Sequence, residues 1–435
     1  MPAKTRFDPV QIARAGRVTA GLEGAAATAA GGVLLWGWLF DAERELRNLR
    51  CEIAGRVLPV ELLDRVPRPD VLEMFASAIS SPTPDVGLLG LCQADPDLLR
   101  AAGGRVSLAV EAAGGAAATA NRLAFEPGSS FEAMLGERLP VRLMRPEPIR
   151  RAGEALWAPE AARVLAQARR NARGQRFGPD RPARLSLVVP LGENIAVLGE
   201  TLAYLDMDPD RSALELVLVL QREEDWTSAE TAIAGAATDL PILVVRTGAA
   251  LSAGVAARVG LDAASADRVV LMSDSVVPPS RGWMADTLED LDTAALVLPE
   301  LMPRFDGLPQ RFEPRAAPVP TAWPHEDVRA LLRAQAARAG LGRWSPGLVA
   351  GGKGALTALD IGWSALATAD AFWTLLTAEA GRAGAASLRA GPLFTVAPVT
   401  AEADLSADMR LLDFYTLADR LGRASGGASV PAAAE

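Results

Sequence analysis

Cysteine and histidine are scarce in this sequence of 435 residues, which has two cysteines, Cys51 and Cys92, and one histidine, His325. No Cys-x-x-Cys pair occurs, so a structural zinc site built on cysteines is excluded and a disulfide framework is not expected. We expect two free, buried thiols in a reducing compartment. With one histidine, which we place on the surface near the start of a helix, acid–base chemistry would fall to carboxylates.

Basic charge and long apolar runs are also lacking. The net charge is −9, and the densest group of arginines, within residues 169–184, is interrupted by glycine and proline. Nucleic-acid binding needs a basic face, so we expect no nucleic-acid partner and interpret this segment as a solvated linker. No apolar run reaches the roughly 20 residues of a membrane helix, and the first 18 residues are too polar for a signal peptide. These absences predict a cytoplasmic protein with no membrane span. Peripheral membrane association and the oligomeric state stay open.

The composition is globular, with 50% hydrophobic and 22% charged residues. A chain of this length is expected to form two or three domains. Alanine and glycine are abundant and arginine greatly outnumbers lysine, which is typical of a high-GC bacterial genome.

Short strand patterns separated by turn signals begin after residue 30 and continue to about residue 125. Such a series without long helical periods predicts a small β-sandwich over residues 28–127, preceded by a partly disordered lead-in, 1–27. Trp36 and Trp38 lie two apart on one predicted strand and therefore face the same side. A place in the sandwich core is the default for this pair, and a platform for stacking sugars is the alternative.

Residues 128–182 are interpreted as a helical linker with an amphipathic helix over 154–172. An α/β domain follows over 183–422, and residues 423–435 form a low-complexity tail that we expect to be disordered.

Apolar segments of strand length alternate with helical segments in the α/β domain. The expected strands are residues 185–191, 214–220, 242–245, 268–272 and 295–298. This alternation predicts a doubly wound, mostly parallel sheet. Ligands of such sheets bind at the carboxyl ends of the strands, where residues 191–194, 221–225 and 273–275 fall.

Four blocks of this domain follow one another in a defined order and spacing: Leu185–Leu191, Leu214–Leu220, Arg268–Pro278 with the following Gly282-Trp283-Met284, and Leu296–Gly307. In this order and spacing they resemble family 2 glycosyltransferases. The resemblance implies a GT-A fold and the transfer of a sugar from a nucleotide-sugar donor to a glycan acceptor, as in bacterial cell-surface polysaccharide or glycoconjugate assembly. Gly37-Trp38-Leu39-Phe40-Asp41 also looks like part of a β-domain that precedes some bacterial relatives.

The resemblance also implies functional residues. Asp274 corresponds to the acidic motif that holds Mn²⁺ or Mg²⁺ against the donor diphosphate, and Asp370 is the best remaining candidate for the catalytic base. The expected nucleotide-sugar-binding positions are Pro190, Leu191, Glu193, Gln221, Glu223 and Arg258.

The sequence departs from the family pattern at these same positions. Met272 stands where the first acid of the metal motif is expected, and Gln221 begins the segment where aspartates contact the nucleotide base. Asp370 lacks its usual acidic neighbour, and its other interpretation is a helix N-cap. Two hypotheses follow: an active glycosyltransferase, or a degenerate glycosyltransferase fold that acts as a non-catalytic binding or scaffold subunit. A carbohydrate-binding protein that uses the N-terminal β-domain is a more distant alternative.

Overall fold

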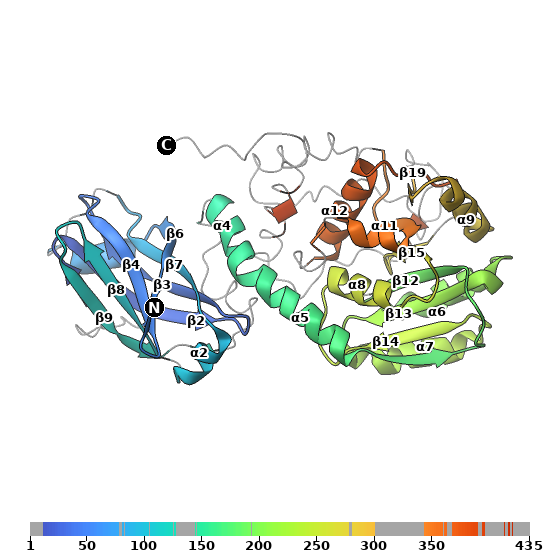
Figure 1. Cartoon of the computed structure of the whole chain (residues 1–435), viewed down its shortest axis with the longest axis horizontal. Coiled ribbons are helices and arrows are strands. Elements are labelled where there is room, and N and C mark those ends of the chain that lie inside the picture. Colours follow the sequence, from blue (N-terminus) through green and yellow to red (C-terminus); the bar gives the residue numbers. More distant parts are fainter. Residues whose placement is uncertain are drawn as a thin grey trace. The chain divides into compact units, whose positions relative to one another are not determined.

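The structure is a computed structural model of the whole chain, which forms two compact units, Met1–Glu160 and Ala161–Glu435 (Figure 1). The residues that it describes are 12–77, 81, 83–103, 105–124, 126–127, 144, 146–192, 194–277, 281–300, 343–359, 361–362, 368–389, 394–395, 413, 416–417 and 420. Among them, no helix has both the length and the apolar character needed to cross a membrane.

The first unit contains two β-sheets that enclose a common core. One sheet has the strand order β1 (Ile12–Ala15), β2 (Val18–Ala27), β3 (Gly32–Phe40), β7 (Gly87–Gln93) and β6 (Glu61–Val66), with β10 (Glu126–Pro127) paired to β2. The other has the order β5 (Arg56–Pro59), β4 (Leu46–Ile53), β8 (Arg105–Ala112) and β9 (Ala117–Ala124). Neighbouring strands are antiparallel except for the parallel pair β10–β2. Side chains from both sheets form one buried cluster, so the predicted β-sandwich is confirmed.

The predicted lead-in is wrong for residues 12–27, which form β1 and β2. Strand β2 lies between β1 and β3, and only Glu23 among its residues is not fully buried. The segment is rich in alanine and glycine and has few of the bulky residues that mark a strand. Its small residues fit under large neighbours, since a Cβ atom at Gly21 would lie 2.3 Å from the indole of Trp38. The strand propensities of these residues did not indicate a strand, because small residues are required here by packing under large neighbours.

The predicted place of Trp36 and Trp38 in the sandwich core is wrong, because neither belongs to the buried cluster between the two sheets. Trp38 is fully buried and packs against Phe40 and Phe75 on the second, smaller apolar cluster of this unit. Asp41, which follows them, accepts hydrogen bonds from the backbone N–H groups of Glu45 (2.7 Å) and Leu46 (3.2 Å) and so closes the turn into β4. Trp38 and Asp41 of the Gly-Trp-Leu-Phe-Asp segment therefore have structural roles, and Trp38 is not a sugar platform.

A helical stretch follows the strands of the first unit in the sequence, as predicted for residues 154–172. It consists of α4 (Pro146–Ala152), a five-residue π-helical turn (Gly153–Trp157) and α5 (Ala158–Asn171). The rest of the predicted linker differs, because β11 (Arg173–Phe177) is an exposed edge strand of the large sheet, antiparallel to β14. Exposed arginines on an edge strand hinder pairing with other chains, which explains why this strand looks like a polar linker in the sequence.

The second unit is built on an eight-stranded sheet. Its strand order is β11, β14 (Ile242–Arg246), β13 (Leu214–Leu220), β12 (Leu185–Leu191), β15 (Arg268–Met272), β18 (Leu348–Gly352), β17 (Leu296–Leu298) and β19 (Ala386–Ser387). Strands β11 and β18 are antiparallel to the others, and a separate pair joins β16 (Val276–Val277) to β20 (Phe394–Thr395). The predicted class, a mostly parallel α/β sheet behind a small β-sandwich, is confirmed.

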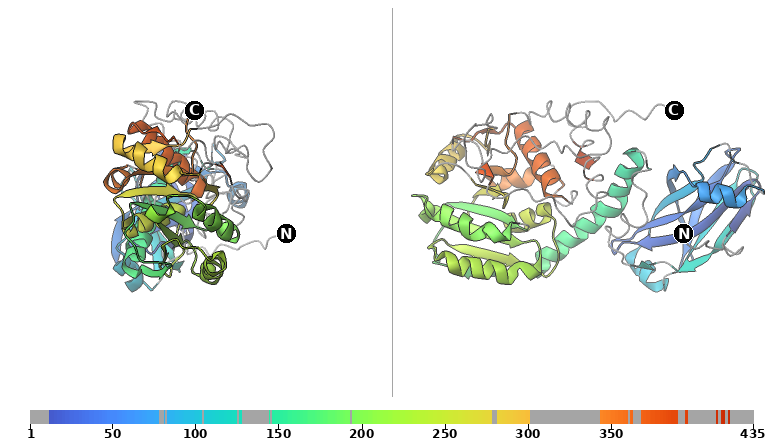
Figure 2. Two further views of the ribbon diagram at one scale, coloured as in Figure 1. Left: turned by 90° about the vertical axis from the view of Figure 1, so that its right-hand side faces the viewer. Right: turned by 180° about the vertical axis from the view of Figure 1, so that it is seen from behind.

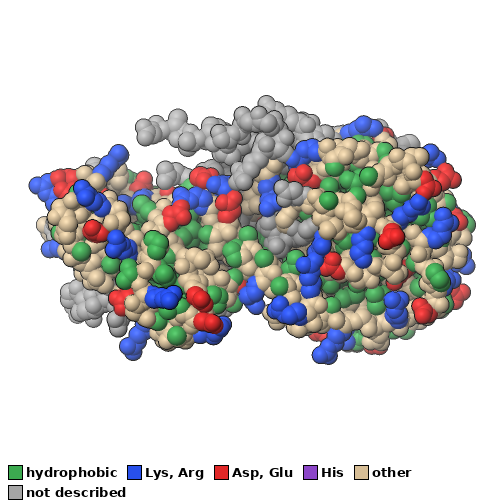
Figure 3. Space-filling view, viewed as in Figure 1, with side chains coloured by type: hydrophobic (Ala, Val, Ile, Leu, Met, Phe, Trp, Pro, Cys, Tyr) green, Lys and Arg blue, Asp and Glu red, His purple; other side chains and the backbone are tan. Residues whose placement is uncertain are grey.

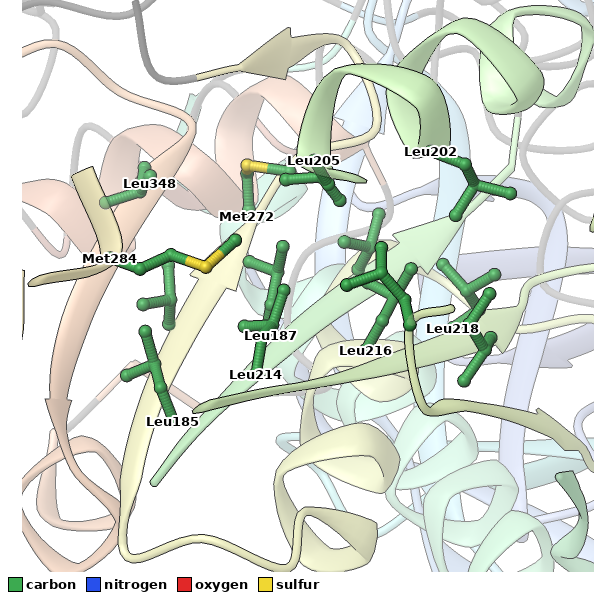
Figure 4. Close-up of a cluster of buried hydrophobic side chains, with 14 of the residues drawn as sticks. Leu185, Leu187, Leu202, Leu205, Leu214, Leu216, Leu218, Met272, Met284 and Leu348 are labelled. Atoms are coloured by element: carbon green, nitrogen blue, oxygen red, sulfur yellow. The ribbon is translucent and has the colours of Figure 1, made fainter. Parts of the chain in front are cut away.

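Helices cover both faces of this sheet (Figures 1 and 2). Those of one face contribute to the main core and are α6 (Leu198–Asp206), α7 (Trp226–Ala236) and α9 (Trp283–Thr293). Helix α8 (Ala253–Ala263) packs on β12, β13 and β15, and α12 (Ala369–Arg382) packs on β17, β18 and α8. Figure 4 shows leucines of β12, β13 and α6 in the core, together with Met272 and Met284.

The order of the strands creates a switch point beside β12. The chain runs from β12 to β13 and β14 on one side, and then returns to place β15 on the other side of β12. Connections leave β12 in opposite directions there, and ligands of open α/β sheets bind in the crevice at the carboxyl ends of such strands. The segments that follow β12, β13 and β15 are therefore the place to look for a site.

Candidate functional site at the carboxyl edge of the sheet

Asp274 bridges the two sides of the switch point. Its carboxylate accepts hydrogen bonds from the backbone N–H groups of Gly192 (3.0 Å) and Asn194 (3.3 Å) and from the Asn194 side-chain amide (3.2 Å). Gly192 and Asn194 follow β12, whereas Asp274 follows β15. The acid that resembles a metal ligand thus fixes the loop after β12.

The residues around Asp274 are buried and paired. The side chain of Met272 is fully buried in the main core, where Figure 4 shows it near Leu205 and Leu348. The hydroxyl groups of Ser273 and Ser275 lie 2.9 Å apart and form a hydrogen bond, and both residues are buried. This Ser-Asp-Ser turn therefore presents one carboxylate at the edge of the sheet.

A divalent cation does not fit this set of groups. Mg²⁺ and Mn²⁺ require several oxygen ligands, commonly carboxylates. Both oxygens of Asp274 accept N–H groups, whose positive ends oppose a cation, and the first position of the motif is an apolar side chain in the core. Among the described residues, no group of three or more His, Cys, Asp or Glu side chains could hold a metal ion. The structure thus gives no support to the predicted metal role of Asp274.

Gln221 joins the same site from the end of β13. Its backbone N–H donates to the carbonyl of Leu191 (2.9 Å). Its carbonyl accepts from the backbone N–H of Leu251, which lies between β14 and α8 (2.8 Å). The Gln221 side chain lies against Gly192, where an added Cβ atom would be 2.7 Å from its amide nitrogen. The segments after β12, β13 and β15 are therefore tied together by Asp274 and Gln221.

Pro190 and Leu191, two of the predicted nucleotide-binding residues, are buried in β12. Leu191 belongs to the main core, so its side chain is not available to a ligand. Glu193 lies outside the described residues. Gly192 and Asn194, which lie in the predicted segment 191–194 but were not named as binding residues, provide the polar contacts of this loop.

Glu223 and Arg258 have other partners. Glu223, in the turn after β13, accepts from the guanidinium of Arg246 (2.8 Å), which also lies over the ring of Trp226. Arg258 forms an ion pair with Asp262, one turn further along α8 (3.4 Å). Because α8 begins after β14 and ends before β15, this pair points toward the opposite edge of the sheet. The structure does not bring Arg258 to the switch point.

Asp370 lies in the first turn of α12, but it is not the cap of this helix. The hydroxyl of Thr368 accepts from the N–H of Ala371 (3.4 Å), so Thr368 is the N-cap. The N–H of Thr368 donates to the buried carboxylate of Asp413 (2.6 Å), which ties the C-terminal part of the chain to the start of α12. The N-cap interpretation of Asp370 is thus wrong, and its role as a base stays a prediction.

A second acid–arginine group lies after β17. Glu300 accepts from the hydroxyl of Ser387 (2.6 Å) and from the guanidinium of Arg343 (3.1 Å), and Arg343 lies over the ring of Trp344. The Ser387 hydroxyl, followed by Arg343, lowers the pKa of the Glu300 carboxyl. Glu300 is therefore an exposed, ionised acid that joins three segments of the chain, and a proton acceptor with a lowered pKa is a weak base.

The Gly-Gly-Lys-Gly segment at residues 351–354 does not form a phosphate loop. Gly351 and Gly352 end β18, and the Lys353 amine donates to the carbonyls of Ala264 (2.9 Å) and Asp262 (3.3 Å) at the C-terminal end of α8. A lysine there satisfies carbonyl groups that lack helical partners and complements the helix dipole.

Comparisons with known proteins add little beyond the fold. No protein-family model matches the sequence, and no curated protein matches it. Solved structures with some likeness include a mannosyltransferase from Pyrobaculum calidifontis in complex with GDP-Man and Mn²⁺, at 20% identity and a TM-score of 0.25 over 36% of this chain and 47% of that chain. Glucosyl-3-phosphoglycerate synthase from Mycobacterium tuberculosis in complex with phosphoglyceric acid is 18% identical, with a TM-score of 0.36 over 57% of this chain and 82% of that chain. Residues 1–349 of TarS from S. aureus are 15% identical, with a TM-score of 0.34 over 55% of this chain and 65% of that chain. At these low scores, the description of the fold rests on the strand order of the sheet itself.

Proposed function

We propose that the second unit is a glycosyltransferase-like domain of the GT-A type that binds a nucleotide-sugar, or its nucleotide, without a divalent cation. We infer that it does so as a non-catalytic subunit in the assembly of bacterial cell-surface polysaccharide or glycoconjugate. The four sequence blocks that resemble family 2 glycosyltransferases include β12, β13, β15 and β17. The contact between Asp274 and the loop after β12 carries the proposal.

That contact supports binding because it orders the loops at the switch point. Asp274 holds Gly192 and Asn194, and Gln221 lies against Gly192, so three loops at the switch point are fixed before a ligand arrives. A preorganised site loses less conformational entropy when a ligand binds. Gln221 and Asn194 carry neutral amide groups, which both donate and accept hydrogen bonds and so suit a nucleotide base or a sugar hydroxyl.

The same contact argues against sugar transfer. A departing diphosphate must be stabilised by a cation or by positive side chains. Here the acid of the metal motif is engaged with N–H groups, and its usual partner is replaced by the buried Met272. Arg258, the one cation predicted for the site, pairs with Asp262 instead.

Active transfer is the second candidate, and the position of Asp370 favours it. Thr368 fulfils the capping role that would otherwise explain an aspartate at this helix start. The resemblance places a catalytic carboxylate in this region of the chain. Asp370 therefore remains the residue to test for base catalysis.

Thermal melting with UDP, GDP and their sugar conjugates tests the proposal, in parallel samples with EDTA or Mn²⁺. Ligands that bind only the native state raise the melting temperature, and we expect the same shift in both samples. Asp274→Ala should reduce the shift because the loop is released, whereas Arg258→Gln, a control away from the switch point, should preserve it.

A nucleotide-release assay on the same samples separates the two candidates. The binding role predicts no nucleoside diphosphate released above background with glycan acceptors. Turnover that needs Mn²⁺ and is lost in Asp370→Asn would establish the transferase instead. No shift with any nucleotide at millimolar concentration would exclude both.

A further inference from the structure

The two cysteines of the chain meet inside the β-sandwich of the first unit. The sulfur atoms of Cys51 and Cys92 lie 3.2 Å apart, although the residues are 41 positions apart in the sequence. Cys51 is in β4 and Cys92 is in β7, which belong to different sheets. The pair therefore spans the space between the sheets, where both residues are part of the buried core.

We propose that Cys51 and Cys92 form an oxidation site at which a peroxide converts the thiol pair into a disulfide bond between the two sheets. The chain has no other cysteine, so an intramolecular disulfide has a single outcome. The separation of the sulfur atoms is that of a hydrogen bond, and only a short approach is needed to form the covalent bond. The sequence had predicted free, buried thiols, and the structure adds that they are neighbours.

The surroundings assign different parts to the two thiols. Cys51 is fully buried, and its hydrogen bond with Cys92 lowers its pKa, whereas that bond and burial raise the pKa of Cys92. The thiolate is the nucleophilic form of cysteine, so the lowered pKa supports Cys51 as the first nucleophile of the proposed reaction. Cys92 is 8% exposed and lies near the end of β7, so it is the more accessible of the two thiols.

The reaction balances with hydrogen peroxide as the oxidant. The Cys51 thiolate attacks one peroxide oxygen, an S–O bond forms, the O–O bond breaks, and the departing hydroxide takes a proton to become water. Cys92 then loses its proton and attacks the Cys51 sulfur, so that the S–S bond forms, the S–O bond breaks and a second water leaves. Two thiols lose two electrons in total, and one peroxide is reduced to two waters.

Oxidation would join the two sheets of the sandwich by a covalent bond. A disulfide restricts the unfolded chain, and the effect grows with the length of the loop that it closes. For a bond between residues 41 positions apart we expect the melting temperature of the first unit to rise by about 10 °C. A reductant should reverse the shift.

Peroxide treatment of the full-length chain tests this inference by intact mass, thiol counting after denaturation and peptide mapping. We expect a loss of two mass units, no remaining thiol, and one cross-linked peptide pair that contains Cys51 and Cys92. Cys51→Ser and Cys92→Ser should retain one thiol or gain oxygen, without the rise in melting temperature. These effects are independent of nucleotide binding by the second unit.

The same chain unfolded in urea is the control for geometry, and it needs no variant to fold. The folded chain should form the disulfide at least tenfold faster than the unfolded chain at the same pH and peroxide concentration. Equal rates, or oxygen addition to both cysteines without a cross-link, would overturn the inference.

Discussion

Two carboxylates at opposite edges of the same sheet show how differently an acid can be used. Glu215, at the amino edge, is 2% exposed and accepts hydrogen bonds from the Ser186 hydroxyl (2.9 Å) and from the N–H and hydroxyl of Ser265 (2.9 and 2.6 Å). Asp274, at the carboxyl edge, is only partly buried and accepts from the loop after β12. Both acids join segments that are distant in sequence. Glu215 does so almost out of contact with solvent, whereas Asp274 does so at a partly exposed position.

The comparison teaches that the partners of an acid, rather than its place in a motif, indicate its chemistry. Asp274 stands in a motif that predicts a metal ligand, yet its donors are N–H groups. Glu215 lies in the block Leu214–Leu220 and was not predicted as a functional residue, although it organises the start of β12, β13 and β15. A buried polar group must be paired, which makes Glu215 a structural requirement of the sheet.

The largest expected effect is that of Glu215→Ala. Removing this carboxylate leaves the Ser186 and Ser265 donors without their acceptor inside the protein and releases Arg176, which lies 3.5 Å away. We expect the free energy of unfolding of the second unit to fall by about 3 kcal/mol. Chemical denaturation measures this loss. Glu224→Ala, at a side chain that is 77% exposed, should stay within about 0.5 kcal/mol of the wild type. Equal effects of the two substitutions on the free energy of unfolding would contradict the structural role of Glu215.

A smaller loss of stability is expected for Asp274→Ala, because the site is partly open to water. Water can replace the lost acceptor for Gly192 and Asn194, so we expect a loss of about 1 kcal/mol. Hydrogen exchange should increase at the amides of Gly192 and Asn194 and remain unchanged at Ser265. A stability loss as large as that of Glu215→Ala would show that the carboxyl edge is as tightly built as the amino edge.

Two residues at the start of α12, the N-cap Thr368 and the candidate base Asp370, are expected to differ in their contribution to stability. Thr368→Ala removes the N-cap side chain and should cost about 1 kcal/mol. Asp370→Asn keeps the shape of the side chain but removes its charge from the first helical turn, so the expected loss is about 0.5 kcal/mol. Thermal melting of the two variants gives this order, and a Thr368→Ala variant as stable as the wild type would contradict the N-cap role of Thr368.

Lys353→Met is expected to have the smallest effect. The methionine keeps most of the apolar stem and loses the amine that donates to the carbonyls of Asp262 and Ala264, so we expect a loss of about 0.5 kcal/mol. Binding of nucleotides should be unchanged, because this end of α8 lies at the amino edge of the sheet. A loss of nucleotide binding in Lys353→Met would point to a phosphate site that the structure does not show.

The sequence predicted the centre of the large sheet well and its borders poorly. Strands β12, β13 and β15 were predicted with their observed bounds, because strands buried on both faces appear as continuous apolar runs. The antiparallel β18 was missed, since it inserts between β15 and β17 from far along the chain and ends in two glycines. The periodicity of apolar residues can indicate a strand, but it does not indicate which strands lie beside it in the sheet.

The candidate site was predicted in position but not in chemistry. The segments after β12, β13 and β15 do meet, because carboxyl ends of neighbouring parallel strands share one edge. The pairing of Asp274 with two backbone N–H groups depends on the orientation of peptide groups in the loop after β12, which side-chain identity does not reveal. The capping role of Thr368 had a signal in the sequence, since threonine favours this position and stands immediately before the helix.

The central claim is that Asp274 orders a cation-independent binding crevice, and isothermal titration of the full-length chain tests it most directly. The dissociation constant of the nucleotide that gives the largest melting shift is measured in EDTA and in Mn²⁺, for the wild type and for Asp274→Ala. The account predicts equal constants in EDTA and Mn²⁺ for the wild type and weaker binding of the variant in both. Wild-type binding that is at least tenfold tighter in Mn²⁺, with this advantage lost in Asp274→Ala, would show that Asp274 is a metal ligand after all and would contradict the account.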